Sequence, residues 1–234
     1  MALVTDFHTH VLPGIDDGAR DVGTSLDMVR AIGAQGVQCL VATPHFYATR
    51  DRIDRFLNRR QLAWEALQRQ LPSCLPRIVL GAEVAFFRGI SKAKEIEALE
   101  IEGTNAMLLE MPFRRWSEED VNEVASLIKR RGFDIVLAHI ERYMMMQENR
   151  NLVERILEMP VKVQINAEGL LDWRQRGKLA KMVKAGRVHL LGSDCHDMGR
   201  RPPNLGAGRE VLLRKAGQDC LDAIDVFSER LLLG

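Results

Sequence analysis

Two histidines near the start of the chain are spaced to bind a metal ion. His8 and His10 follow a short apolar segment, and alternate side chains of an extended chain point to the same side. Two imidazoles that converge at the end of a strand form a chelating pair. Taken alone, the pair fits two solvated loop histidines equally well, so its meaning depends on the rest of the chain.

Residues of the types that bind metals also stand where other apolar segments end. In an α/β barrel the carboxyl ends of the strands meet on one face, where catalytic sites are built. Histidines with a structural role have no reason to stand at strand ends. His189 lies within a segment, and alternation points its side chain to the opposite side from Asp194, so it is interpreted as a packing residue. The remaining residues of this pattern are Asp16, Asp17, His45, Glu83, Glu110, His139, Asp194 and His196.

The elements that must position these side chains alternate between strands and helices. Segments 54–71 and 117–131 have helical periodicity, and Ser117 with Asp120 predicts a capping box for the second, with Gly132 as its stop. Strands that alternate with helices imply parallel β-α-β units. No glycine-rich turn follows the first strand, which disfavours an open dinucleotide-binding sheet. We therefore expect an α/β fold, a distorted (β/α)7 TIM-like barrel forming a single domain over residues 1–234, with strands at 3–8, 37–43, 78–84, 106–111, 135–139, 161–166 and 188–193.

Composition excludes several classes of protein. The 234 residues carry 33 Lys+Arg against 32 Asp+Glu and are 46% hydrophobic, which disfavours disorder and a polybasic nucleic-acid arm. No apolar run approaches the ~18–20 residues of a membrane span, and the first residues do not read as a signal peptide. We expect a cytoplasmic protein without nucleic-acid binding or membrane insertion. The cysteines, Cys39, Cys74, Cys195 and Cys220, form no C-x-x-C pair, which argues against a disulfide framework or a zinc ribbon.

The motifs together resemble the polymerase and histidinol phosphatase (PHP) superfamily. Within it they are similar to the manganese-dependent bacterial protein tyrosine phosphatases of capsular and exopolysaccharide operons, the CpsB/YwqE type. The resemblance runs from Asp6 to about Pro203. It rests on His8-Thr9-His10, Asp16-Asp17-Gly18, Thr43-Pro44-His45, Gly81-Ala82-Glu83, Leu109-Glu110, His139-Ile140-Glu141-Arg142-Tyr143, Ser193-Asp194-Cys195-His196 and Gly199-Arg200-Arg201-Pro202-Pro203.

The resemblance implies a site for three divalent transition-metal ions. It assigns one ion to His8, His10, Glu83 and Asp194, a second to Glu83, Glu110 and His139, and a third to Asp17, His45 and His196. Asp16 is expected to support the turn or a ligand. Histidines and carboxylates without thiolates suit Mn²⁺, Fe or Zn²⁺, and Mn²⁺ is the expected metal. Three divalent ions outweigh four carboxylates, so the loaded site is positive and suits a phosphate monoester.

We therefore expect a metal-dependent protein tyrosine phosphatase that attacks phosphotyrosine with a metal-bound hydroxide and releases phosphate. The resemblance implies that Arg142 and Arg201 clamp the phosphate, and that the substrate is a bacterial tyrosine autokinase controlling polysaccharide synthesis. Tyrosine leaves as a phenolate of pKa ~10, so a strong general acid is dispensable. The side chains expected to contact the rest of the substrate are Phe46, Tyr47, Arg114 and Arg115.

Other interpretations of the same residues remain open. Cys195 and Arg201 have the C-x5-R spacing of cysteine-dependent phosphatases, although Asp194 would raise the pKa of the thiol and Pro202 removes a backbone donor. A PHP phosphatase could instead hydrolyse a small phosphomonoester such as histidinol phosphate. In a non-enzymatic module, metals would only hold the fold. The residues Met144-Met145-Met146 are interpreted as packing or interface residues, and segment 206–232 as packing helices.

Overall fold

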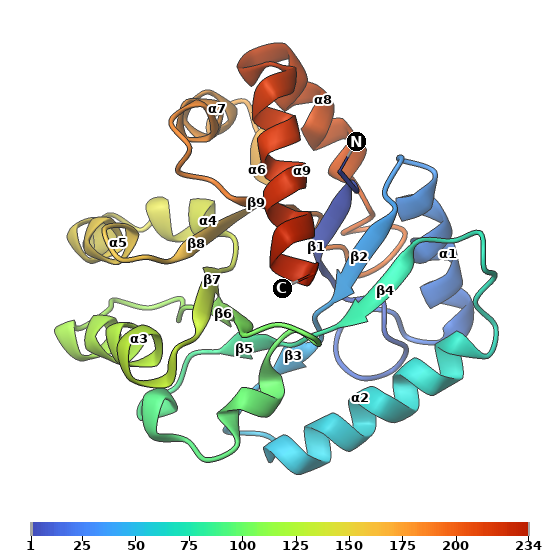
Figure 1. Ribbon diagram of the computed structural model, residues 1–234, viewed down its shortest axis with the longest axis horizontal. Helices are drawn as coiled ribbons and strands as arrows, with labels where there is room; N and C mark the ends of the chain where they lie inside the picture. Colours follow the sequence, from blue (N-terminus) through green and yellow to red (C-terminus); the bar gives the residue numbers. More distant parts are fainter. Residues whose placement is uncertain (1, 234) are drawn as a thin grey trace.

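A curled sheet of parallel strands forms the middle of the protein, and helices lie around its outer side (Figure 1). The computed structural model describes residues 2–233. Hydrogen bonding divides the sheet into a three-stranded part in the order β1-β2-β4 and a six-stranded part in the order β3-β5-β6-β7-β8-β9. The strands are β1 (Thr5–Thr9), β2 (Cys39–Ala42), β3 (His45–Phe46), β4 (Arg77–Leu80), β5 (Glu83–Ala85), β6 (Ala106–Glu110), β7 (Asp134–Leu137), β8 (Lys162–Asn166) and β9 (Leu190–Gly192).

All seven expected strands are present, and one of them is split. The segment expected as a single strand at 78–84 forms β4 and β5, which are interrupted at Gly81 and Ala82. The segment that carries β2 and β3 is interrupted at Thr43 and Pro44. Pro44 has no N–H to donate to a neighbouring strand. The two interruptions divide the hydrogen-bonded sheet at the same level. The α/β class and the curled parallel sheet are thus confirmed.

The first and last strands of the sheet lie side by side. Thr9 and Cys195 form an isolated parallel bridge. Beside it, the Asp194 N–H donates to the His8 carbonyl at 2.8 Å and the His10 N–H to the Cys195 carbonyl at 3.0 Å. The backbone therefore joins the segment of His8 and His10 to that of Asp194 and Cys195, which lie far apart in the sequence.

Most of the helices cover the outer side of the sheet, and the start and stop signals predicted for α3 are confirmed. The capping box of Ser117 and Asp120 opens α3, which ends at Gly132 with a left-handed φ of 75°. The other long helix expected in the first half of the chain is α2, and the expected tail helices are α8 and α9. The helices are α1 (Val22–Gly33), α2 (Ile53–Gln68), α3 (Glu118–Arg131), α4 (Ile140–Met144), α5 (Arg150–Leu157), α6 (Ala167–Leu171), α7 (Arg176–Lys184), α8 (Leu205–Ala216) and α9 (Gln218–Leu233).

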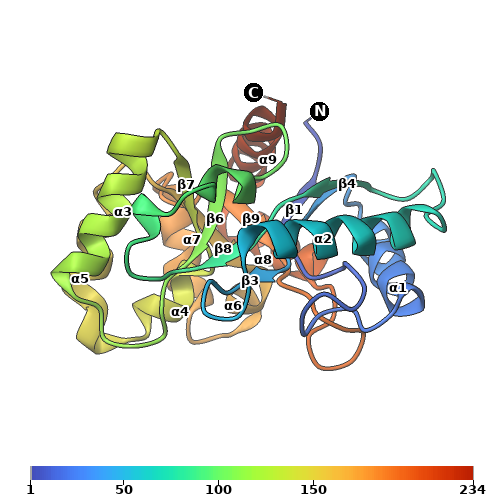
Figure 2. The same cartoon turned by 90° about the horizontal axis from the view of Figure 1, so that it is seen from below.

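Two apolar clusters hold these layers together. The larger one joins the outer face of the strands to the helices. The smaller one consists mostly of strand residues, among them Phe7, Leu108 and Val136, and the end of α9 packs on it through Leu232. The smaller cluster therefore fills the inside of the curl, and α9 covers the end where the strands begin. Figure 2 shows both chain termini on that side.

The helices include no membrane span among the described residues, and the methionine triplet lies at the end of α4. None of the helices within residues 2–233 has the length and apolar character that crossing a bilayer requires. In the triplet, Met144 and Met146 pack against the larger cluster, whereas Met145 is 58% exposed. Two of the three side chains thus have the packing role that we expected.

Candidate metal centre

Nine histidine, aspartate and glutamate side chains gather where the strands end, and they are the nine that the family resemblance assigns as ligands. Most of them are buried, although charged and polar groups are rarely buried without partners. Their ring and carboxylate atoms face one another in three overlapping groups. These residues are His8, His10, Asp17, His45, Glu83, Glu110, His139, Asp194 and His196.

The first group brings His8 and His10, near the start of the chain, and Asp194, after β9, to Glu83 of β5. His8 Nε2 lies 3.2 Å from His10 Nε2 and 3.2 Å from Glu83 Oε2. His10 Nε2 lies 3.3 Å from Glu83 Oε2 and 3.4 Å from Asp194 Oδ1. Two imidazoles and two carboxylates thus turn their ligand atoms toward one another, in the grouping that the resemblance implies for the first ion.

The second group uses the other oxygen of Glu83. His139 Nε2 lies 2.9 Å from Glu83 Oε1 and 3.5 Å from Glu110 Oε1. Because Glu83 turns Oε2 toward the first group and Oε1 toward the second, its carboxylate lies between the two groups. This is the bridging position that we expected for Glu83.

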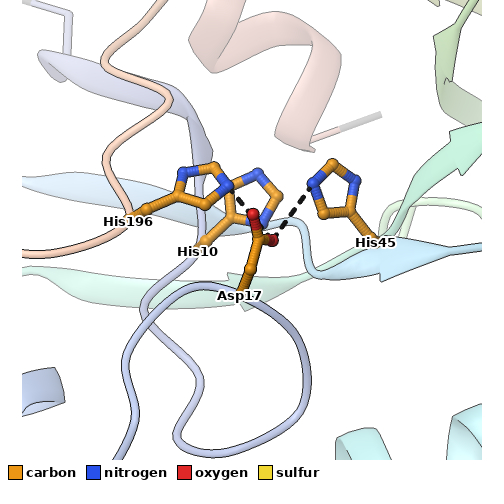
Figure 3. A group of neighbouring side chains, drawn as sticks. All are labelled: His10, Asp17, His45 and His196. Carbon is orange, nitrogen blue, oxygen red and sulfur yellow. Dashed lines mark ion pairs between the residues drawn. The ribbon is translucent and has the colours of Figure 1, made fainter. Parts of the chain in front are cut away.

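The third group is drawn in Figure 3, where His10, Asp17, His45 and His196 point toward one another. Asp17 Oδ1 lies 3.4 Å from His45 Nε2 and 3.5 Å from His196 Nε2. The rings of His10 and His196 stand 3.8 Å apart. His45 Nδ1 also lies 2.9 Å from Glu83 Oε2, so this group touches the first one as well.

Several of these atoms have no hydrogen-bond partner within the described chain. Glu83 Oε2, His45 Nδ1 and His196 Nε2 are all buried and unpartnered. Buried polar atoms are almost always bonded in native proteins, so atoms that face one another without bonding need another partner. The donor set of imidazole nitrogens and carboxylate oxygens fits divalent transition metals.

The electrostatics of the cluster also call for positive charge. Burial alone would raise the pKa of Glu83, but the charge of His8 and the hydrogen bond between His139 and Glu83 Oε1 hold it well below its ordinary value. Burial would lower the pKa of His139, but bonds to Glu110 and Glu83 raise it to about 9. Protonated imidazoles thus balance the buried carboxylates, a task that bound cations can take over.

Local backbone geometry aims several ligands. His139 and Asp194 have positive φ values of 33° and 53°, which side chains other than glycine rarely adopt. In β1, Phe7 and His8 together stand opposite the single residue Val41, because the register shifts between Asp6↔Leu40 and Thr9↔Ala42. Such a bulge re-aims a side chain. Phe7 packs inside the curl, while His8 reaches the ligand cluster.

Asp16 supports the ligands without joining a group. Its Oδ2 lies 2.8 Å from His10 Nδ1 and accepts the His45 N–H at 2.9 Å, while Oδ1 accepts the Gly18 N–H at 2.9 Å. A Cβ at Gly18 would lie only 2.3 Å from the His10 carbonyl oxygen, which explains the glycine of the turn. The turn and supporting role expected for Asp16 is confirmed, and it fixes the orientation of His10.

Two supporting residues were not found from the sequence. The Gln164 side-chain oxygen accepts the His139 N–H at 2.8 Å and lies 3.4 Å from His8 Nδ1. Gln164 Nε2 donates to Asn166 Oδ1 at 2.8 Å, and Asn166 Nδ2 donates to Asp194 Oδ2 at 2.8 Å. The sequence feature that could have pointed to them is a pair of amide side chains two residues apart in a buried strand. This strand is the one whose end carries no residue of a metal-binding type.

The two arginines expected at the phosphate reach the rim of the cluster from different segments, Arg142 from α4 and Arg201 from the loop before α8. Arg142 Nη2 donates to Asp194 Oδ2 at 2.6 Å, and Arg201 Nη2 lies 2.8 Å from the same oxygen. Asp194 therefore turns one oxygen to the imidazoles and the other to the guanidinium groups. The two planar guanidinium groups lie beside the ligand cluster, where their N–H donors can bind an anion.

The residues expected around the rest of the substrate divide into different environments. Phe46 is only 2% exposed and packs edge-on against Phe56; we therefore remove it from the substrate contacts. The reason is strand alternation, since Phe46 points away from the side that His45 and Tyr47 share. The Tyr47 ring lies 5.2 Å from the His45 ring and beneath the Arg50 guanidinium.

The arginine pair after β6 is less closely tied to the site. Arg114 forms a two-pronged ion pair with Asp120, at 2.7 and 2.9 Å, and so braces the start of α3. Arg115 is exposed. Phe113, the aromatic residue directly before this pair, is 55% exposed, and its ring stacks 5.8 Å from that of His139.

Cys195 and His189 lie outside the ligand cluster and have structural surroundings. Burial and the charge of Asp6 raise the pKa of the Cys195 thiol to about 12, so the thiolate required by the C-x5-R mechanism is disfavoured. Arg201 pairs with Asp194 instead. His189 Nδ1 accepts the Val163 N–H at 3.0 Å, which confirms its interpretation as a packing residue.

Comparison with known proteins gives concordant matches over most of the chain. The sequence profile described as capsular polysaccharide synthesis, CpsB/CapC, matches residues 4–232. The tyrosine-protein phosphatase YwqE of Bacillus subtilis is 27% identical over 97% of this chain and 91% of its own. The tyrosine-protein phosphatase CpsB of Streptococcus agalactiae is 26% identical over 97% of each.

The fold has a counterpart among solved structures. A structure from the work on YwqE of Bacillus subtilis and CpsB of Streptococcus pneumoniae, described as unique metal-dependent tyrosine phosphatases, superposes with a TM-score of 0.81. It covers 98% of this chain and 94% of its own at 23% identity. An organophosphorus hydrolase of Deinococcus radiodurans superposes less well, with a TM-score of 0.54 at 15% identity. These likenesses concern the fold.

Proposed function

The chain belongs to the CpsB/CapC family of capsular polysaccharide synthesis, and from this premise we propose that it is a metal-dependent protein tyrosine phosphatase. The observation that carries the proposal is the cluster of nine ligand side chains with two arginines at its rim. The names of the YwqE and CpsB relatives support the substrate class.

Three divalent ions would be held by the groups described above. His8, His10, Glu83 and Asp194 would bind the first, Glu83, Glu110 and His139 the second, and Asp17, His45 and His196 the third. When bound, such ions supply Lewis acidity toward phosphoryl oxygens and lower the pKa of water. Mn²⁺ is our proposed metal, with Fe and Zn²⁺ as alternatives that accept the same ligands.

Arg142 and Arg201 bind and orient the phosphate in this proposal. Each guanidinium presents a fork of N–H donors that matches two phosphate oxygens, and both already converge on Asp194 Oδ2. As charge builds on the equatorial oxygens during hydrolysis, fixed donors stabilise it without reorganising. Tyrosine departs as a phenolate, which is a good leaving group without a strong acid.

The aromatic part of the substrate would meet the rings at the edge of the cluster. Tyr47 is the expected contact that stays near the ligands, beside His45. Phe113 adds an exposed ring beside His139. Arg114 and Arg115 remain proposed contacts only for more distant parts of a protein substrate, because Arg114 braces α3.

We further propose the biological setting that the family suggests. The phosphoprotein substrate is a bacterial tyrosine autokinase that controls capsular or exopolysaccharide synthesis, and the enzyme acts in the cytoplasm. We also propose that residues 1–234 form one domain, and that the curled sheet is a distorted (β/α)7 barrel. The backbone bridge between Thr9 and Cys195 supports that last point.

The test combines metal analysis with hydrolysis of a phosphotyrosine peptide. We expect about three transition ions per chain, loss of turnover in chelator and recovery with Mn²⁺. His139→Gln should lose bound metal and activity, whereas the matched His189→Gln should keep both. Full activity in chelator, or equal metal content in both variants, would refute the proposal. Faster turnover of histidinol phosphate than of the peptide would favour the small-substrate phosphatase instead.

A further inference from the structure

A cavity of about 760 Å³ opens beside the third ligand group. Asp17 and His45 form its inner end, and Arg50, Arg55 and Arg59 line it further out, on the loop before α2 and on α2 itself. Its volume lies in the range of sites that enclose small ligands or side chains. The cavity therefore continues the metal centre outward, with basic residues along its course.

One of the three arginines holds the cavity in shape. Arg59 Nη2 lies 2.6 Å from Asp51 Oδ2, and Arg59 Nη1 donates to the Ile15 carbonyl at 3.0 Å. The first bond ties α2 to the loop before it, and the second ties α2 to the loop that carries Asp17. The charges of Arg59 and Asp51 cancel within the cavity wall, so neither is available to a ligand.

The other two arginines keep their charge available. Arg55 is exposed and forms no ion pair with any residue between 2 and 233. The Arg50 guanidinium stands 4.8 Å above the Tyr47 ring, a contact that orients it while leaving its N–H donors free at the edges.

The carboxylates of the inner end do not oppose an anion once the centre is loaded. Asp16 already bonds to His10 and to two backbone N–H groups. Asp17 is 66% exposed, but it is a ligand of the third ion in the proposed function. With that ion bound, the unpaired charge in the cavity is positive.

We infer that this cavity binds an anionic side chain that neighbours the scissile phosphotyrosine, through Arg50 and Arg55. The inference rests on the proposed function and adds a sequence preference to it. Carboxylates and phosphates both match the fork of a guanidinium, so the neighbour is an acidic residue or a second phosphotyrosine. The enzyme thus selects acidic or multiply phosphorylated segments of its protein substrate.

The test compares peptides on the metal-loaded, full-length protein. One phosphotyrosine peptide carries glutamate neighbours, a second carries a non-hydrolysable phosphonate analogue of phosphotyrosine, and a third carries glutamine. Free phosphotyrosine reports the chemistry without neighbours. We expect kcat/KM to be about three- to tenfold higher for an anionic peptide than for the neutral one, and the ratio to shrink as salt screens the exposed charges. The ratio of kcat/KM for the glutamate peptide to that for the glutamine peptide measures the preference for a carboxylate. The same ratio for the phosphonate peptide measures the preference for a phosphate.

Substitutions locate the preference. Arg55→Gln and Arg50→Gln should each bring the ratio toward one. Arg69→Gln is the matched control, because Arg69 is exposed at the other end of α2, about 20 Å away at 1.5 Å per residue. Equal kcat/KM for all three peptides would overturn the inference and leave the proposed function standing. The same holds if Arg69→Gln lowers the ratio as much as the Arg50 and Arg55 substitutions do. No turnover of any of the three peptides by the metal-loaded protein would overturn the proposed function and the inference with it.

Discussion

Replacing Gln164 by leucine should weaken the metal centre without removing a ligand. Gln164 is fully buried. Its side chain joins His139, His8 and Asn166 through one short bond to the His139 N–H, one to Asn166 Oδ1 and one longer contact to His8 Nδ1. Leucine has a similar volume and can make none of them.

The magnitude follows from the groups left without partners. The His139 N–H and Asn166 Oδ1 would both become buried and unsatisfied, and each such group costs about 1–3 kcal/mol. We therefore expect the metal-free variant to lose about 2–6 kcal/mol of unfolding free energy. The loss of a group that orients two ligating histidines should weaken metal binding by about 10–100-fold.

Two assays separate these effects. Urea denaturation of the metal-free proteins gives the change in stability, and titration with Mn²⁺ gives the change in affinity. Ile165→Val is the matched control on the same strand, because Ile165 belongs to the outer apolar cluster. It should cost about 0.5–1.5 kcal/mol of stability and leave metal affinity unchanged.

Binding of Mn²⁺ by Gln164→Leu as tightly as by the unmodified protein would refute the orienting role of Gln164. That role is also refuted if Ile165→Val weakens binding to the same extent, since the effect would then come from general loosening of β8. A stability loss without an affinity loss would show that the amide serves packing only.

Three further predictions concern the residues around the centre. Cys195→Ser should retain phosphatase activity, measured with a phosphotyrosine peptide, because the buried thiol has a pKa raised to about 12; an inactive but metal-loaded variant would restore the cysteine mechanism. Burial lowers the folded pKa of His189, so the unfolded chain binds more protons below pH ~6.5 and stability should fall there as the pH drops. Urea midpoints at pH 7 and 5.5 should show this fall, and His189→Gln should flatten it. Gly18→Ala should lower the melting temperature because its Cβ would collide with His10, whereas Gly177→Ala, with open space around it, should not lower it.

The ligands could be predicted from the sequence because their positions follow local rules. Short apolar segments marked the strands, and the residue types at their ends kept one phase, from His8 to His196. Parallel strands bring their ends to one face, so the approximate site followed without coordinates. The capping box at Ser117 and the stop at Gly132 depend equally on nearby residues and were also confirmed.

The supporting residues could not be predicted because their partners are distant in the sequence. Gln164 contacts His8 across 156 positions, and neither residue type signals the other. Arg114 looked like a substrate contact because it lies near the site, but Asp120 binds it. An arginine's partner depends on which carboxylate the fold brings within reach.

The sequence by itself determined which chemistry is available: histidines and carboxylates in strand phase, with arginines close to them. Only the tertiary structure decided how these groups meet. The bulge in β1 turns His8 to the cluster although Phe7 faces the inside of the curl, and Phe46 falls in the core beside His45. The alternation of side chains is a property of one strand, whereas register and bulges arise from pairing between strands. The fold likewise brings Asp17 to the arginines of α2 and the loop before it, around one cavity, although these residues are distant in the sequence.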